Sequence, residues 1–84
     1  MVLHLGQEVV VHGEEIIGIF DLEKATVSKR TKEYLNHVTK RGNVVTVSYE
    51  MPKSFVVTAR DGKETTYISQ ISSATLLRRA SKRM

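Results

Sequence analysis

The fold is decided by the stretch FVVTARDGKETTYI, which covers residues 55–68. Its two halves, residues 55–59 and 65–68, are rich in β-branched and aromatic side chains, which favour strands. Between them lies Asp61-Gly62, a residue pair that tolerates the two positive φ angles of a type I′ turn. The stretch therefore predicts an antiparallel β-hairpin.

Further strands are predicted upstream of this hairpin. Residues 44–49 alternate in hydropathy, and a turn follows them at Pro52, which has no backbone N–H for a strand ladder. Near the start of the chain, three short apolar and β-branched runs predict three more strands at residues 2–5, 8–12 and 16–20. Because the joints between these three are short, we expect them to form an antiparallel meander.

A central helix is predicted between the third and fourth of these strands. Its apolar stripe recurs at helical spacing: Val27, Thr31, Tyr34, Leu35 and Val38. Thr26 or Ser28 can cap its start, and Gly42 predicts its end. Lys29 and Arg30 lie in the first turn, where cations oppose the helix dipole, so this basic face is either a binding surface or an ordinary solvated face.

A second helix is predicted at the C-terminus, from a cap at Ser72 or Ser73 to Lys82. Four cations follow its apolar residues and fall on one side of a continued helix: Arg78, Arg79, Lys82 and Arg83. They form either a ridge that contacts phosphates or a frayed helix end where cations suit the dipole.

The elements together predict a single α+β domain over residues 1–84. We expect a mostly antiparallel sheet of about six short strands with two helices, one central and one C-terminal. Eighty-four residues are near the lower limit for a self-sufficient core, and the absence of cysteine excludes disulfides. Contacts between subunits are therefore expected to contribute to stability.

The charge of the chain is sorted along its length. The first 23 residues contain five acids and no Lys or Arg, whereas residues 24–84 contain all 13 basic residues and four acids. The two segments carry net charges of −5 and +9, which give the overall charge of +4. The basic surface can attract a polyanion, or the acidic surface can dock on a neighbour's basic surface in a head-to-tail assembly.

The sequence offers little for catalysis, metal binding or membrane insertion. His4, His12 and His37 lie on different predicted elements without metal-ligand spacing, and the five glycines are too scattered for a phosphate-binding loop. There is no run of about 18 apolar residues, and the start of the chain lacks the features of a signal peptide. We therefore expect no enzyme activity, no cofactor, no metal, no small-molecule substrate, no membrane contact and a cytoplasmic location.

Four stretches, in this order, resemble the RemA/RemB family of extracellular matrix regulatory proteins, and the RemB branch more than the RemA branch. They are HLG (4–6), IIGIFD (16–21), PKSFVVT (52–58) and SSATLLRRA (72–80). The resemblance implies a LytTR-like domain that assembles into a ring, and in the RemA branch such rings bind repetitive promoter DNA and activate matrix genes.

The resemblance also exposes departures from the RemA pattern. RemA-type proteins use an arginine just before the third strand and an arginine pair in the turn leading to the fifth strand. Here these places are taken by Glu15 and by Glu50-Met51. Lys53 still matches a RemA-type arginine near that turn.

Two functions follow as hypotheses. The first is a DNA-binding transcriptional regulator that acts as a homo-oligomeric ring on double-stranded DNA and contacts its phosphates through seven cations: Lys53, Arg78, Arg79, Lys82 and Arg83, with Lys29 and Arg30 in reserve. The second is a ring-forming protein-interaction module that does not bind DNA.

Overall fold

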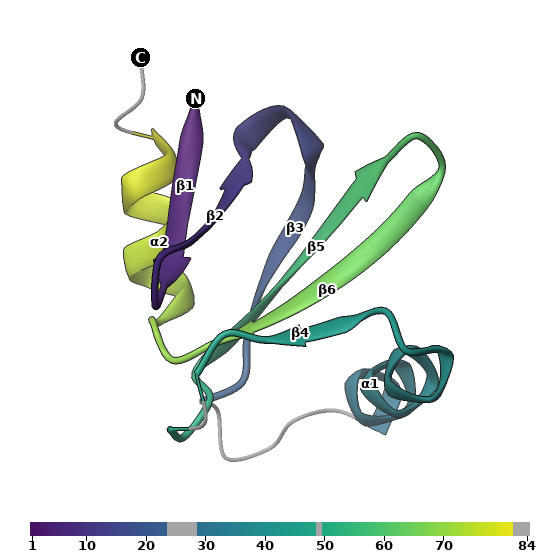
Figure 1. Ribbon diagram of the computed structural model, residues 1–84. Coiled ribbons are helices and arrows are strands. Elements are labelled where there is room, and N and C mark those ends of the chain that lie inside the picture. The colour runs from purple at the N-terminus through teal and green to yellow at the C-terminus, as the bar shows by residue number, and fades with distance from the viewer. Residues whose placement is uncertain (24–28, 49, 82–84) are drawn as a thin grey trace.

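The computed structural model describes residues 1–23, 29–48 and 50–81. In this part of the chain, six short strands form two sheets, and two α-helices complete the α+β fold that the sequence predicts. The two helices lie on opposite sides of the molecule (Figure 1). In chain order the elements are β1 (Val2–Gly6), β2 (Val9–His12), the 3-10 turn η1 (Gly13–Glu15), β3 (Ile16–Asp21), α1 (Lys29–Arg41), β4 (Val44–Thr46), β5 (Ser54–Arg60), β6 (Lys63–Ser69) and α2 (Ser73–Ser81).

The β5–β6 hairpin forms as predicted and supplies the centre of the larger sheet. Arg60 pairs with Lys63 across a two-residue turn, in which Asp61 and Gly62 have φ angles of 51° and 80°. Both angles lie in the left-handed region that a type I′ turn requires. The first five residues of β5 are all buried, although successive strand residues point to opposite faces. Both faces of this strand are therefore covered.

The predicted N-terminal meander is wrong. β1 and β2 do pair, but as a separate two-stranded sheet, and Glu8 lies in their two-residue turn rather than in a strand. β3 pairs instead with β5, where Phe20 lies opposite Phe55. The turn η1 separates β2 from β3, and β3 satisfies the backbone groups along the edge of β5 that β6 does not reach.

The larger sheet has the strand order β3-β5-β6-β4, and it is antiparallel except at its last pair. β4 runs parallel to β6, with Val44 opposite Thr66. The strand is shorter than the predicted residues 44–49, since it ends at Thr46, and Tyr49 lies outside the described residues.

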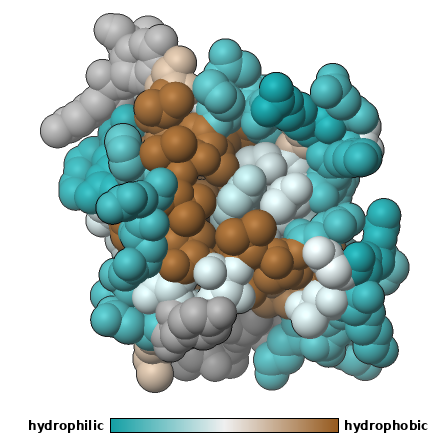
Figure 2. All heavy atoms as spheres, viewed as in Figure 1, coloured by the Kyte–Doolittle hydropathy of each residue, from teal (hydrophilic) through white to brown (hydrophobic). Residues whose placement is uncertain are grey.

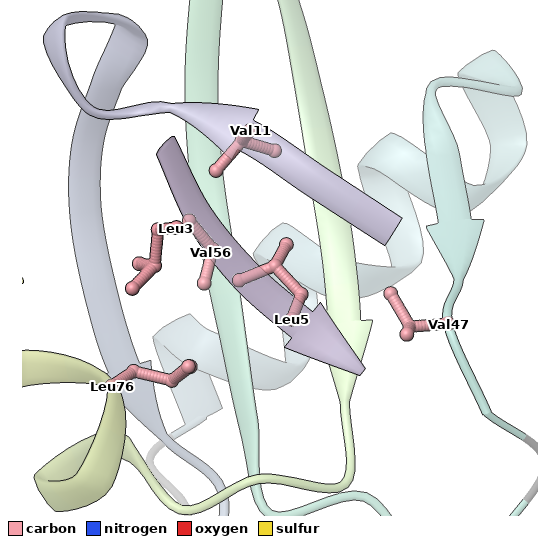
Figure 3. Close-up of a cluster of buried hydrophobic side chains, with 6 residues drawn as sticks. All are labelled: Leu3, Leu5, Val11, Val47, Val56 and Leu76. Carbon is pink, nitrogen blue, oxygen red and sulfur yellow. The ribbon is translucent and has the colours of Figure 1, made fainter. Parts of the chain in front are cut away.

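The core lies between the larger sheet, the β1–β2 hairpin and α2. It is formed by six buried side chains (Figure 3): Leu3, Leu5, Val11, Val47, Val56 and Leu76. Val56 points from β5 towards the hairpin, so its neighbours Phe55 and Val57 point to the opposite face, where α1 packs. The sheet thus carries different layers on its two faces.

The outer face of the β1–β2 hairpin is exposed in the described part of the chain. Val2 is 50% exposed and Val10 45% exposed, and hydrophobic side chains gather over this hairpin in Figure 2. Contiguous exposed apolar side chains often mark a surface of protein contact.

The C-terminal end of α1 and the N-terminal cap of α2 form as the sequence predicts, whereas the predicted end of the second helix at Lys82 lies outside the described residues. The end of α1 is a Schellman motif, in which Gly42 has a φ of 79°, its N–H donates to the carbonyl of Thr39, and the N–H of Asn43 donates to that of Val38. Ser72 caps α2, since its hydroxyl accepts from the N–H of Thr75. The proposed caps of α1, Thr26 and Ser28, lie outside the described residues.

Candidate nucleic-acid interface

The first group of predicted DNA contacts lies on the last turn of α2. Arg78 and Arg79 are both exposed and belong to a regular helix that continues to Ser81. The Arg79 guanidinium donates to the carbonyl of His4 at 3.5 Å, which draws its side chain towards β1. Lys82 and Arg83 follow this turn, but they lie outside the described residues.

Lys53 lies at the other end of α2. Its side chain is exposed, while its backbone is fixed because its N–H donates to the carbonyl of Ser69 and its carbonyl accepts from Leu22, both at 2.9 Å. Ser69 lies only four residues before Ser73, the first residue of α2. Since a helix rises 1.5 Å per residue, the α2 cations begin about 9 Å along the helix axis from its cap.

Lys29 and Arg30 belong to a different surface. Both are exposed at the start of α1, which packs on the face of the larger sheet opposite to the hairpin and α2. Arg30 lines an apolar groove beside Phe20 and Tyr34. The structure therefore does not bring the described predicted cations together into one site: it separates them into an α1 group and a group along α2.

Glu15 occupies the place where the resemblance implies a RemA-type arginine. It ends η1, and its Oε2 lies 3.5 Å from the Nε of Arg60 at the end of β5. The two side chains line one cleft together with Lys63 and Asp61. A carboxylate thus lies beside Arg60, in a cleft that Lys63 also lines, and it lowers the local positive potential there.

A basic region at this turn was missed in the sequence. Arg41, Asn43 and Lys63 line a mostly polar cleft of about 510 Å³, together with Glu64. In the sequence these cations indicate only a helix end and a hairpin turn. They come together because β4 runs parallel to β6, a pairing for which the local sequence holds no signal.

The described residues contain no group of three His, Cys, Asp or Glu side chains placed to hold a metal ion. The hydroxyls of Ser72 and Thr75 are engaged in the cap of α2. Within the same residues, no helix is long and apolar enough to cross a membrane.

Known proteins similar to this chain are regulators rather than enzymes. The sequence pattern of the RemA-like family, described as Extracellular matrix regulatory protein A-like, matches residues 2–80. The chain is also similar to Extracellular matrix regulatory protein B of Bacillus subtilis (strain 168), with 40% identity over 80 residues that cover 95% of this chain and 90% of that protein. Both comparisons confirm the resemblance drawn from the four short stretches. The chain therefore belongs to the RemA-like family of extracellular matrix regulatory proteins.

Proposed function

We propose that this protein is a transcriptional regulator of extracellular-matrix genes that acts in the cytoplasm as a homo-oligomeric ring and binds the backbone of double-stranded DNA. The observation that carries the proposal is the match to a matrix-regulator family over residues 2–80, joined to a chain whose cations all follow residue 23. A regulator of genes must contact DNA itself or bind a protein that contacts DNA. A strongly basic surface favours direct contact with DNA.

The contacts are assigned to the surface that runs along α2. Lys53 lies near one end of this helix, and Arg78 and Arg79 lie near the other, followed in the sequence by Lys82 and Arg83. Exposed Lys and Arg side chains on long flexible stems suit phosphates better than base edges, so we expect little sequence readout from one subunit. Lys29 and Arg30 lie on the other side of the subunit and serve only if DNA passes around it.

A ring makes weak single contacts sufficient. Each phosphate contact contributes a modest and salt-dependent increment, and repetition around a closed assembly converts these increments into avidity. The uncovered apolar side chains of the hairpin, such as Val2 and Val10, support assembly.

A ring-forming interaction module that does not bind DNA is the second candidate. The Glu15–Arg60 pair favours it, because a carboxylate stands where a RemA-type protein has an arginine, and it neutralises a neighbouring cation. On this reading, the basic surface docks on an acidic protein partner.

Salt dependence separates the two candidates. Fluorescence anisotropy with a labelled random duplex, measured between 50 and 200 mM salt, should give a straight line of log K against log salt with a negative slope. Absence of binding at 50 mM salt by an intact oligomer would favour the interaction module.

A further inference from the structure

A groove lies between the β3 edge of the larger sheet and α1, on the face opposite to α2. It encloses about 380 Å³, and its apolar lining includes Ile17, Phe20, Tyr34 and Phe55. Ile17 is 58% exposed and Phe20 44% exposed, although both side chains are large and apolar. We call this surface the β3–α1 groove.

The side chains of the groove are held in place before anything binds. The Phe20 ring stacks on Phe55 with a centroid separation of 4.8 Å, and Tyr34 stacks on the same ring at 6.0 Å. A Cβ on Gly18 would lie 2.6 Å from the Phe20 ring, so the ring lies against β3 only because this residue is glycine. The Tyr34 hydroxyl also lies 3.2 Å from the Thr66 hydroxyl, within hydrogen-bond distance. A surface held in this way loses little conformational entropy on binding.

Ile17 is directed outward by an irregularity of the strand. The β3–β5 ladder passes from the pair Ile16 and Thr58 to the pair Gly18 and Val57, so a bulge falls at Ile17. Bulges at sheet edges re-aim side chains and discourage simple strand addition. The groove is therefore suited to a side chain of a partner rather than to an added strand.

The exposed face of α2 offers a matching side chain. Leu76 is 0% exposed because it points into the core, and this fixes the rotation of the helix so that the next residue, Leu77, is 53% exposed. Ala74, Arg78 and Ser81 share the stripe of Leu77, since residues three and four apart are neighbours on a helix. The stripe has an apolar centre with a cation beside it.

The groove offers one carboxylate to a cation of α2. Glu64 is the carboxylate among the described residues that line the groove, whereas the sequence from Thr65 to the C-terminus contains no acid. Arg78 follows Leu77 directly and can reach such a carboxylate at the rim of a contact. Arg30 also lines the groove, so a docked α2 has to turn Arg78 towards Glu64 and away from Arg30.

These two surfaces cannot meet within one subunit, because α2 packs on the hairpin side of the sheet and the groove opens on the α1 side. We propose that Leu77 on α2 of one subunit seats in the β3–α1 groove of a second copy of this chain, with Arg78 beside Glu64. The contact joins two different surfaces and therefore runs head to tail, which generates a ring when the rotation closes. This inference rests on the proposed function, in so far as that function requires a homo-oligomer, and it gives Arg78 a second role beside phosphate contact.

Matched substitutions on the two surfaces test the contact. Ile17→Ser and Leu77→Ser each remove an exposed apolar side chain, so both variants are expected to fold as the parent does. Each should raise the protein concentration at which the oligomer dissociates by about tenfold or more, as measured by light scattering after size exclusion. Met51→Ser is the control, because Met51 is 82% exposed and lies in neither surface. Parent-like mass for both variants overturns the proposal.

Mixing the two variants tests the head-to-tail geometry. The Ile17→Ser subunit keeps an intact α2, and the Leu77→Ser subunit keeps an intact groove, so one good contact remains between them. An equimolar mixture should therefore form a dimer of the two variants under conditions where each alone is monomeric. No association in the mixture overturns the proposal. The proposal is also overturned if Ile17→Ser abolishes assembly and Leu77→Ser leaves it intact, because that result indicates groove-to-groove pairing.

A charge exchange provides a second route that spares the apolar side chains. Glu64→Lys should weaken assembly at low salt because it faces Arg78, and adding Arg78→Glu should restore it. Equal masses for the single and double variants contradict the placement of Arg78.

Failure of this contact is distinguishable from failure of the proposed function. A monomeric parent protein contradicts the ring itself, whereas an oligomeric parent that tolerates Leu77→Ser contradicts only the contact.

Discussion

The Nε of Arg60 lies 3.5 Å from the Oε2 of Glu15, and this pair joins the acidic first part of the chain to the basic remainder within a single subunit. Some of the acidic and basic residues therefore pair with each other inside the subunit rather than with another molecule. Arg60 is 73% exposed and Glu15 24% exposed at the side chain, so water screens the attraction.

The first prediction concerns the stability that this pair contributes. Glu15→Gln keeps the size of the side chain but removes its charge, and we expect the free energy of unfolding to fall by about 0.5 kcal/mol, the usual value for an exposed ion pair. Urea denaturation at low and high salt checks this. A loss of about 2 kcal/mol or more would show that the pair is much less solvated than its exposure indicates.

The second prediction concerns the electrostatic effect of Glu15 on DNA. Glu15→Lys makes the cleft that Arg60 and Lys63 line more cationic, in the place where RemA-type proteins carry an arginine. We expect tighter binding to duplex DNA and a steeper salt slope, by about 0.9 for each added phosphate contact, with the mass of the oligomer unchanged. Anisotropy and light scattering on the same samples check both parts. Smaller species at low salt would instead place this edge against a neighbouring subunit.

The third prediction isolates the cap of α2. Ser72→Ala removes the hydroxyl that accepts from the N–H of Thr75 at 3.2 Å, and it should cost about 1 kcal/mol of stability. Ser73→Ala is the control, because Ser73 is the first residue inside the helix, and its effect should stay within about 0.5 kcal/mol. Denaturant midpoints that rank the two variants in the opposite order would assign the cap to Ser73.

The fourth prediction contrasts two adjacent leucines. Leu76 is fully buried in the core and Leu77 is 53% exposed, so Leu76→Ala should cost about 2–5 kcal/mol in unfolding free energy. Leu77→Ala should change it by about 0.5 kcal/mol or less when measured on the monomer. Because a small domain has a total stability of about 5–15 kcal/mol, the first variant is expected to unfold well below the temperature of the parent. Equal thermal midpoints would contradict the described rotation of α2.

Local signals in the sequence predict the ends and turns of this fold well. Asp61-Gly62, Gly42 and Ser72 each act through backbone groups within a few residues, and all three have the predicted geometry. β3 pairs instead with β5, a buried strand that is distant from it in the sequence. No local pattern in the sequence predicts this pairing. The predicted meander is wrong for this reason. Short joints favour pairing between strands that are neighbours in the sequence, but the backbone hydrogen-bonding groups of the buried strand β5 also need a partner, and β3 provides it.

In the candidate site, too, the sequence predicts local features but not how distant parts of the chain are arranged. The sequence identifies Lys53, Arg78 and Arg79 as cations, and the structure shows all three exposed. The sequence does not reveal that α1 and α2 lie on opposite sides of the sheet (Figure 1), and this arrangement separates Arg30 from Arg79. The cleft at Arg41 and Lys63 was likewise hidden, since it arises from the parallel β4–β6 pair.

The most direct test of DNA binding by the α2 surface is the salt slope of the parent beside that of the double variant Arg78→Ala, Arg79→Ala. The parent should bind a random duplex with log K falling linearly against log salt. The double variant should bind more weakly, with a slope shallower by about 2 for each subunit engaged, since each lost phosphate contact removes about 0.9. Comparison at a protein concentration where light scattering shows the same mass for both proteins excludes a loss of avidity alone. An identical slope and affinity in the two proteins would contradict the account, because the arginines of α2 would then make no contact with phosphates.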